Sequence, residues 1–234
     1  MTIPWLALRS LRDRRLTSAL TAATIGLSVA LMIGVVNVQR SARASFAGVV
    51  SGTDLIVGPR GGAIELLLYA VFRLGSPTAN LSYETYQRVA AHPAVAWTIP
   101  LMLGDSHHGY RVVGTNADFY ARYRFHGDQA VALREGRFPD GLWDVAIGSA
   151  VADALGYAVG QPIVVSHGLD AAGFLGHDDR PFELVGILAP TGTPIDHSVY
   201  ITLEGFDAMH LDWHSGAPPQ PGEAMPAEAI HSED

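Results

Sequence analysis

The run from Leu16 to Val38 contains 23 residues and no charged side chain, and Arg14 and Arg15 stand directly before it. As an α-helix with a rise of ~1.5 Å per residue, it is about 34 Å long, enough to cross a hydrocarbon core of ~30 Å. A cleaved signal peptide is the alternative, because 42–44 resembles a cleavage site, but typical signal cores have only ~7–15 apolar residues. We therefore predict a transmembrane helix over residues 16–38.

Small side chains recur at every fourth position of this run. They are Ser18, Ala22, Gly26, Ala30 and Gly34. Lipid tails are as apolar as leucine, so a small-residue stripe gains nothing by facing lipid, whereas it lets two helix backbones approach closely. We predict that the stripe packs against another transmembrane helix. A passive anchor is the alternative, since Ala and Gly are common in all transmembrane helices.

Charge changes sign at the end of the run. Residues 1–43 contain six Arg and one Asp, whereas residues 44–234 contain nine Arg and 22 acidic residues. Four of the first six Arg precede the run, so the positive-inside rule predicts a cytoplasmic N-terminus and an acidic domain outside. That domain has no basic cluster, which argues against nucleic-acid binding. The chain has no cysteine, which excludes disulfides and thiolate chemistry.

Four regions follow from these patterns. We predict a cytoplasmic amphipathic segment over 1–15, the transmembrane helix over 16–38, an extracytoplasmic domain over 44–214 and a disordered tail over 215–234. In the domain, the predicted strands are 54–57, 95–103, 110–113, 145–147, 161–166, 182–188 and 197–202, and 133–139 is a predicted turn. The predicted helices are 63–74, 83–91, 116–124, 149–155 and 204–210. The fold class is thus α+β, with one N-terminal transmembrane helix and a mixed α/β extracytoplasmic domain.

The predicted helix over 63–74 is apolar nearly all round and too short to span a bilayer. Buried core is the simplest interpretation, and an apolar surface that contacts membrane, a partner or cargo is the alternative. The residues that would form such a contact are Ile64, Leu67, Leu68, Val71 and Phe72. The glycine-rich residues 58–62 before it lack the Lys and Ser/Thr of a phosphate-binding loop.

Histidine and aspartate cluster at three places, which suggests zinc binding. The best candidate ligands are His210, Asp212 and His214. In a strand all three would share one face, and in a helix the two histidines would share one face. The other clusters are 105–108 and 177–179. Solvated polar loops are the ordinary alternative, because no HExxH or CxxC pattern is present. Ser149 lacks the G-x-S-x-G elbow of a hydrolase and is better explained as a helix N-cap, so we predict no enzyme activity.

Several short segments together resemble the MacB/FtsX-like permeases of ABC transporters, specifically their MacB-like periplasmic core domain. These segments are Leu8–Arg12, Asp54–Gly61, Arg134–Phe138, Ala146–Ala152, Val159–Gly160 and Phe182–Gly192. The resemblance implies a permease-type subunit of the inner membrane that binds no cofactor itself. Its partners would be the lipid bilayer, a separate ABC ATPase subunit that holds ATP, and a second copy or another transmembrane chain.

Members of that family carry four transmembrane helices, and one is predicted here. We therefore expect either a permease truncated after its periplasmic domain or a subunit whose further helices belong to another polypeptide. The alternative function is a membrane-anchored periplasmic module that binds a metal or ligand without coupling to ATP.

Overall fold

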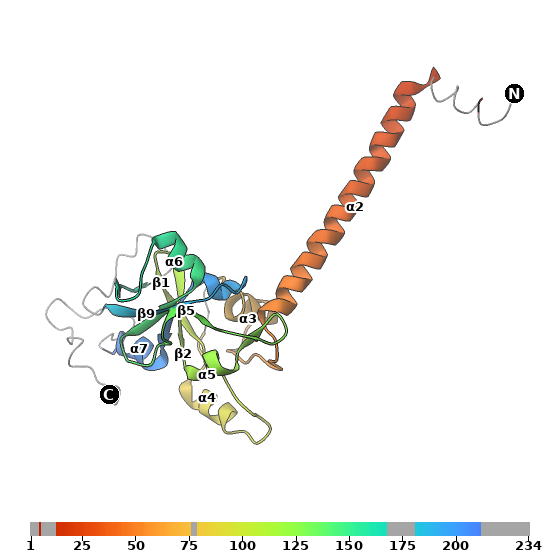
Figure 1. Cartoon of the computed structure of the whole chain (residues 1–234). Helices are drawn as coiled ribbons and strands as arrows, with labels where there is room; N and C mark the ends of the chain where they lie inside the picture. The colour runs from red at the N-terminus through yellow and green to blue at the C-terminus, as the bar shows by residue number, and fades with distance from the viewer. Residues whose placement is uncertain (1–4, 6–12, 76–78, 168–180, 212–234) are drawn as a thin grey trace. The chain divides into compact units, whose positions relative to one another are not determined.

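The computed structural model describes residues 5, 13–75, 79–167 and 181–211 (Figure 1). The predicted tail over 215–234 and most of the predicted amphipathic segment over 1–15 lie outside these residues. The chain divides into two compact units, residues 1–47 and residues 48–234.

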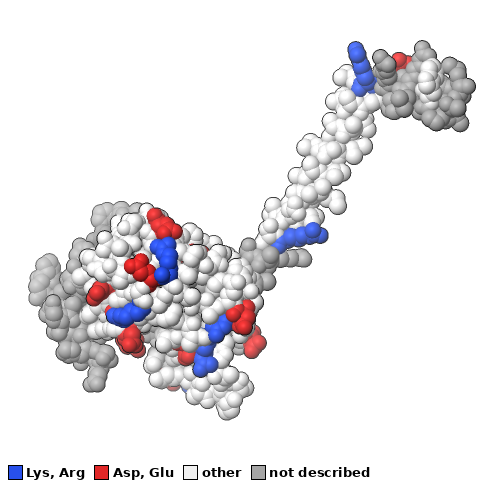
Figure 2. All heavy atoms as spheres, in the orientation of Figure 1, with Lys and Arg blue, Asp and Glu red and all other residues white. Residues whose placement is uncertain are grey.

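The first unit is dominated by α2, a continuous helix of 35 residues from Arg15 to Val49. Among the described residues, one helix is long and apolar enough to cross a membrane, and it is the part of α2 from Arg15 to Ser41. The predicted helix over 16–38 is therefore a helix of spanning length. Figure 2 shows its middle without a charged side chain, with arginines near both ends.

The second unit is built, within the described residues, on an eight-stranded mixed sheet. The strand order is β5-β9-β6-β10-β2-β1-β8, and β7 pairs with β9. The pairs β6/β9 and β10/β2 are parallel and the others are antiparallel. The strands are β1 Met102–His107, β2 Tyr110–Thr115, β5 Leu133–Gly136, β6 Asp144–Ile147, β7 Pro162–Ile163, β8 Ser166–His167, β9 Phe182–Leu188 and β10 Ser198–Thr202. A separate hairpin joins β3 Arg124–Phe125 to β4 Gln129–Ala130.

Helices cover both faces of this sheet. Side chains from α6 (Ser149–Leu155) and α7 (Leu203–Ala208) join one buried cluster, and those from α5 (Ala117–Arg122) join the other. Neighbours along β2 alternate, with Val112 in the first cluster and Val113 in the second. Because both faces are buried, the central strands carry runs of consecutive apolar residues, such as Val145–Ile147 in β6 and Val199–Ile201 in β10. This architecture behind one N-terminal helix confirms the predicted fold class.

Four predicted strand or turn segments are wrong or need new bounds. Residues 54–57 lie in no strand. Regular pairing begins at Met102 rather than at 95, after Pro100, which lacks the N–H that a ladder needs. The predicted turn over 133–139 opens with β5, and the predicted strand over 161–166 divides into β7 and β8.

The predicted helix over 63–74 is shorter than expected: α3 runs from Ala63 to Ala70. The backbone turns left-handed at Arg73, with φ of 60°, and again at Gly75, with φ of 81°, which a helix cannot accommodate. The other short helix before the sheet, α4, runs from Tyr83 to Ala90, and the side chain of Ser82 caps it as hydrogen-bond acceptor from Thr85 N.

The predicted N-cap at Ser149 is also wrong, because Gly148 occupies that position and Ser149 is the first helical residue. A Cβ at residue 148 would lie 2.3 Å from the carbonyl oxygen of Asp196 and 2.4 Å from that of Ile195. Only glycine allows this close approach, which seats α6 against the 3₁₀ helix η1 (Pro194–His197).

Candidate functional site

The stripe of α2 has open space beside it. Apart from the adjacent residues and the backbone of α2 itself, no atom of the described chain lies within 4 Å of the position that a Cβ would occupy at Gly26 or Gly34. A hollow of about 430 Å³ runs beside Ala30 and Gly34. The helix thus presents a narrow, smooth surface there, and its packing against another helix stays a prediction.

Polar side chains in the span bond to their own helix. The hydroxyls of Thr21, Thr24 and Ser28 donate to the carbonyl oxygens four residues earlier, at 2.9, 2.8 and 2.9 Å. Each hydroxyl therefore needs no water partner, so these residues are compatible with a lipid environment.

The apolar helix α3 is a surface element and not core. All eight of its residues are described and none is buried. The exposed fractions of Ile64 and Leu68 are 75% and 42%. The core interpretation is therefore wrong for α3 itself. Of the other predicted contact residues, Val71 is buried, and Leu67 and Phe72 are half-buried.

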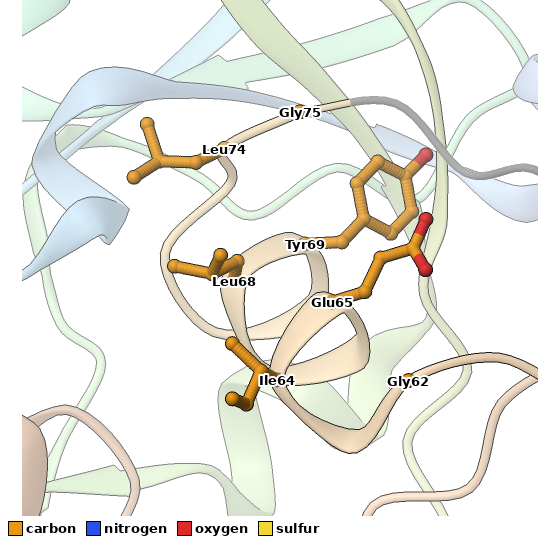
Figure 3. A pocket seen from close by; sticks show the side chains of 7 residues that line it. All are labelled: Gly62, Ile64, Glu65, Leu68, Tyr69, Leu74 and Gly75. Carbon is orange, nitrogen blue, oxygen red and sulfur yellow. The ribbon is translucent and has the colours of Figure 1, made fainter.

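An open hollow of about 480 Å³ lies along α3 (Figure 3). Its lining residues are Gly62, Ile64, Glu65, Leu68, Tyr69, Leu74 and Gly75. Figure 3 shows Ile64, Leu68 and Leu74 along one side of the helix, while Glu65 and Tyr69 point the other way. The helix thus has an apolar side and a polar side.

The polar side attaches α3 to the sheet. The Tyr69 hydroxyl donates to the carbonyl of Leu103 in β1. The guanidinium of Arg111, a residue of β2 with 3% exposure, lies 5.5 Å from the centre of the Tyr69 ring and donates to the carbonyl of Gly75. Burial raises the pKa of Tyr69 to about 12, although the charges of Arg111 and Arg73 oppose the rise. Tyr69 is therefore a neutral donor, and the apolar side faces outward.

Two of the predicted histidine clusters meet in the structure. His210 follows α7, and its Nε2 lies 3.3 Å from Oδ2 of Asp105 in β1, a residue with 2% exposure. The other ring nitrogen, Nδ1, donates to the carbonyl of Phe206 at 2.8 Å. The sequence did not predict this pair, because residues 105 and 210 are far apart in the chain and meet only when α7 packs beside β1.

The zinc hypothesis stays a prediction. Asp212 and His214 lie outside the described residues, as does the cluster over 177–179. Within the described ranges, no group of three or more His, Cys, Asp or Glu could hold a metal ion. His107 is engaged elsewhere, since Nδ1 lies 2.6 Å from the carbonyl oxygen of Val164 and Nε2 lies 3.0 Å from the Tyr157 hydroxyl.

The Asp105–His210 pair should make the stability of the domain pH-dependent. Burial by itself lowers the pKa of His210, but the hydrogen bond and charge of Asp105 and the carbonyl of Phe206 outweigh it and raise the pKa. A raised histidine pKa contributes stability that is complete below the unfolded value of about 6.5 and is lost as pH rises through the folded value. His210→Gln should therefore cost about 1–3 kcal/mol of unfolding free energy near pH 6 and clearly less near pH 9.

Urea unfolding at the two pH values measures this difference, and His197→Gln is the matched control because His197 is exposed. An equal loss at both pH values for His210→Gln would show that the pair contributes no charge-dependent stability.

The serine considered as a nucleophile is not accessible. Ser149 is 4% exposed at the start of α6, so a substrate cannot reach its hydroxyl. The structure therefore gives this residue a packing role.

A family model described as the MacB-like periplasmic core domain matches residues 18–220. The match covers most of the chain and includes both the greater part of α2 and the sheet domain. The chain belongs to this family. No curated protein gives a significant match to the chain.

A solved structure also resembles this MacB-like chain. It is the extracellular domain of the noncanonic ABC-type transporter YknZ from Gram-positive bacteria. The sequences are 14% identical, the TM-score is 0.38, and the alignment covers 54% of this chain and 65% of that domain.

In this MacB-like domain, one of the segments that resemble the family forms a structural ion pair. Arg137, from the segment Arg134–Phe138, binds both carboxylate oxygens of Asp144 at the start of β6, with Nη2 to Oδ1 at 2.8 Å. The backbone N–H groups of Asp140 and Gly141 donate to Oδ2 at 3.0 and 2.6 Å. Burial raises the pKa of Asp144, but these donors and the Arg137 charge outweigh it and lower the pKa, so the pair stays ionised.

Proposed function

We propose that this chain is a permease-type subunit of an ABC transport system, coupled to a separate ATPase subunit that binds and hydrolyses ATP. The observation that carries the proposal is the family match, which begins inside α2 at residue 18 and continues through the sheet domain. A periplasmic core joined to a membrane-spanning helix has the parts needed to pass movement across a membrane. The chain itself would bind no cofactor and catalyse no reaction.

The connection between helix and domain supports this role. The helix α2 is unbroken for 35 residues, and its last residue, Val49, is 5% exposed inside the domain. The N–H of His126 donates to the Gly48 carbonyl at 2.8 Å, and the Tyr123 hydroxyl donates to that of Val49. The proposed movement of α2 would enter the domain at Gly48 and Val49, which these two bonds tie to the residues around the β3–β4 hairpin.

The proposed topology places the N-terminus in the cytoplasm and the domain over 44–214 in the periplasm. The excess of arginine before the span supports this orientation. The stripe of α2 would contact a transmembrane helix of a second copy or of another chain, and the ATPase would act from the cytoplasmic side.

The test is reconstitution of the chain in lipid nanodiscs with the candidate ABC ATPases of the same genome. We expect one of them to co-purify with the chain and to hydrolyse ATP faster in its presence. Inserting three glycines after Ser45, inside α2, should remove this stimulation and leave co-purification intact, because a flexible joint cannot transmit the movement.

The matched control is the same insertion after Ala94, in an exposed turn of the domain. Absence of any associating ATPase would refute the proposal, and stimulation that survives the insertion in α2 would refute its mechanical part.

A further inference from the structure

Exposed apolar side chains are concentrated in one part of the domain. Nine large apolar side chains are exposed among its described residues, and seven of them lie between residues 55 and 83. The seven are Leu55, Val57, Ile64, Leu68, Leu74, Leu81 and Tyr83, and the other two are Val159 and Leu211. Three of the seven, Ile64, Leu68 and Leu74, line the hollow along α3, and an exposed apolar surface of this kind marks an interaction site.

The charge of the same region differs from that of the rest of the domain. Residues 50–75 contain two Arg and two acidic residues, whereas residues 76–211 contain seven Arg and 15 acidic residues. A charged side chain is costly to place in the hydrocarbon of a bilayer, so a protein face that enters lipid should be poor in charge. The apolar region is therefore the electrically neutral part of an acidic domain, which suits it to contact with lipid.

The chain between the candidate span and the domain is short. The span ends at Ser41 and Val49 is buried in the domain, so they are joined by eight helical residues, a stretch of chain about 12 Å long. Tyr123 donates its hydroxyl to Val49, and the charge of Arg73, just after α3, acts on the same tyrosine by opposing the rise of its pKa to about 12. Arg73 is thus within electrostatic range of the tyrosine that binds the last residue of α2.

We propose that Ile64, Leu68 and Leu74, here called the α3 face, insert into the headgroup–acyl boundary of the membrane that α2 crosses. The polar side of α3, with Tyr69 bound to the carbonyl of Leu103, holds the helix so that the apolar side is outward. The proposal rests on the proposed function only in that α2 must span the membrane. Its consequence is that the domain has a second, non-covalent attachment to the bilayer.

The experiment uses the full chain in nanodiscs. Because the chain has no cysteine, the single substitutions Ile64→Cys and Leu68→Cys can each carry one environment-sensitive fluorophore. Lipids with a spin label near the top of the acyl chain serve as quencher. We expect blue-shifted emission and loss of at least about half of the intensity at 64 and 68, as for probes at the interfacial depth of ~5–10 Å.

Two controls separate the possible outcomes. Val159→Cys, an exposed apolar position far along the sequence from α3, should show neither a shift nor quenching. Leu31→Cys, inside the span, should be quenched whenever α2 crosses the bilayer. Quenching at 31 without quenching at 64 and 68 would overturn the α3 proposal alone. A blue shift at 64 without quenching would have the same meaning, because a contact with protein also shifts the emission. No quenching at 31 would overturn the membrane topology itself.

Discussion

Replacing Gly26 and Ala30 together by leucine is expected to weaken the association of α2 with its partner helix by at least about tenfold, because side-chain bulk holds the two backbones apart. Apart from adjacent residues and the backbone of α2 itself, nothing in the described chain lies within 4 Å of a Cβ at Gly26, so the larger side chains should not disturb the fold of the chain. Chemical crosslinking and co-purification, in nanodiscs or in mild detergent, measure the association.

The matched control for this variant is Thr24→Leu with Ser28→Leu. At about 100° per residue these positions lie on the opposite face of the helix, and their hydroxyls bond only to the backbone of α2 in the described structure. The control pair should associate like the unaltered chain. If the Gly26 and Ala30 variant also associates normally, α2 is a passive anchor and the stripe has no partner.

The second large effect is expected in the domain, where Asp196→Ala should lower the unfolding free energy by about 3 kcal/mol. Asp196 is 8% exposed, and its Oδ1 accepts bonds from both the N–H and the hydroxyl of Thr191 at 2.8 Å. Its Oδ2 accepts from the N–H of Gly192 at 2.7 Å. Removing the carboxylate leaves these donors without their acceptor in a largely buried loop.

Urea unfolding of the chain, followed by the tertiary signal of the domain, measures this loss. His197→Ala is the control, because the neighbouring side chain is exposed and its removal should change the unfolding free energy by less than about 0.5 kcal/mol. Asp196→Asn, which keeps an acceptor oxygen, should lie between the two. Equal stability of the Asp196→Ala and His197→Ala variants would show that the hydrogen bonds of the Asp196 carboxylate do not stabilise the domain.

Much of the fold was predictable because its signals are local. The strands β2, β6, β9 and β10 and the helices α4, α5 and α6 all lie where apolar runs, Gly156 and the pattern of turns predicted them. The failure at the start of α6 has a long-range cause. Gly148 displaced Ser149 as N-cap because the carbonyls of Ile195 and Asp196 approach it, and that approach comes from a segment 47 residues away.

The candidate sites were less predictable than the fold. Apolar composition alone could not distinguish core from surface at α3, because the answer depends on which side Tyr69 and Arg111 fix against the sheet. The same limit applies to His210, whose sequence neighbours suggested a metal ligand, whereas its observed partner is Asp105 on a distant strand.

The sequence by itself determined that this chain has a helix of membrane-spanning length, that an acidic α/β domain follows it, and that the whole resembles the MacB-like permeases. Length, charge asymmetry and the alternation of apolar residues are properties of short stretches of chain, so they can be read without coordinates. Only the tertiary structure decided the order of the strands, the pairing of Asp105 with His210 and the outward apolar side of α3. Each of these depends on contacts between residues far apart in the chain, and such contacts leave no mark in the local pattern.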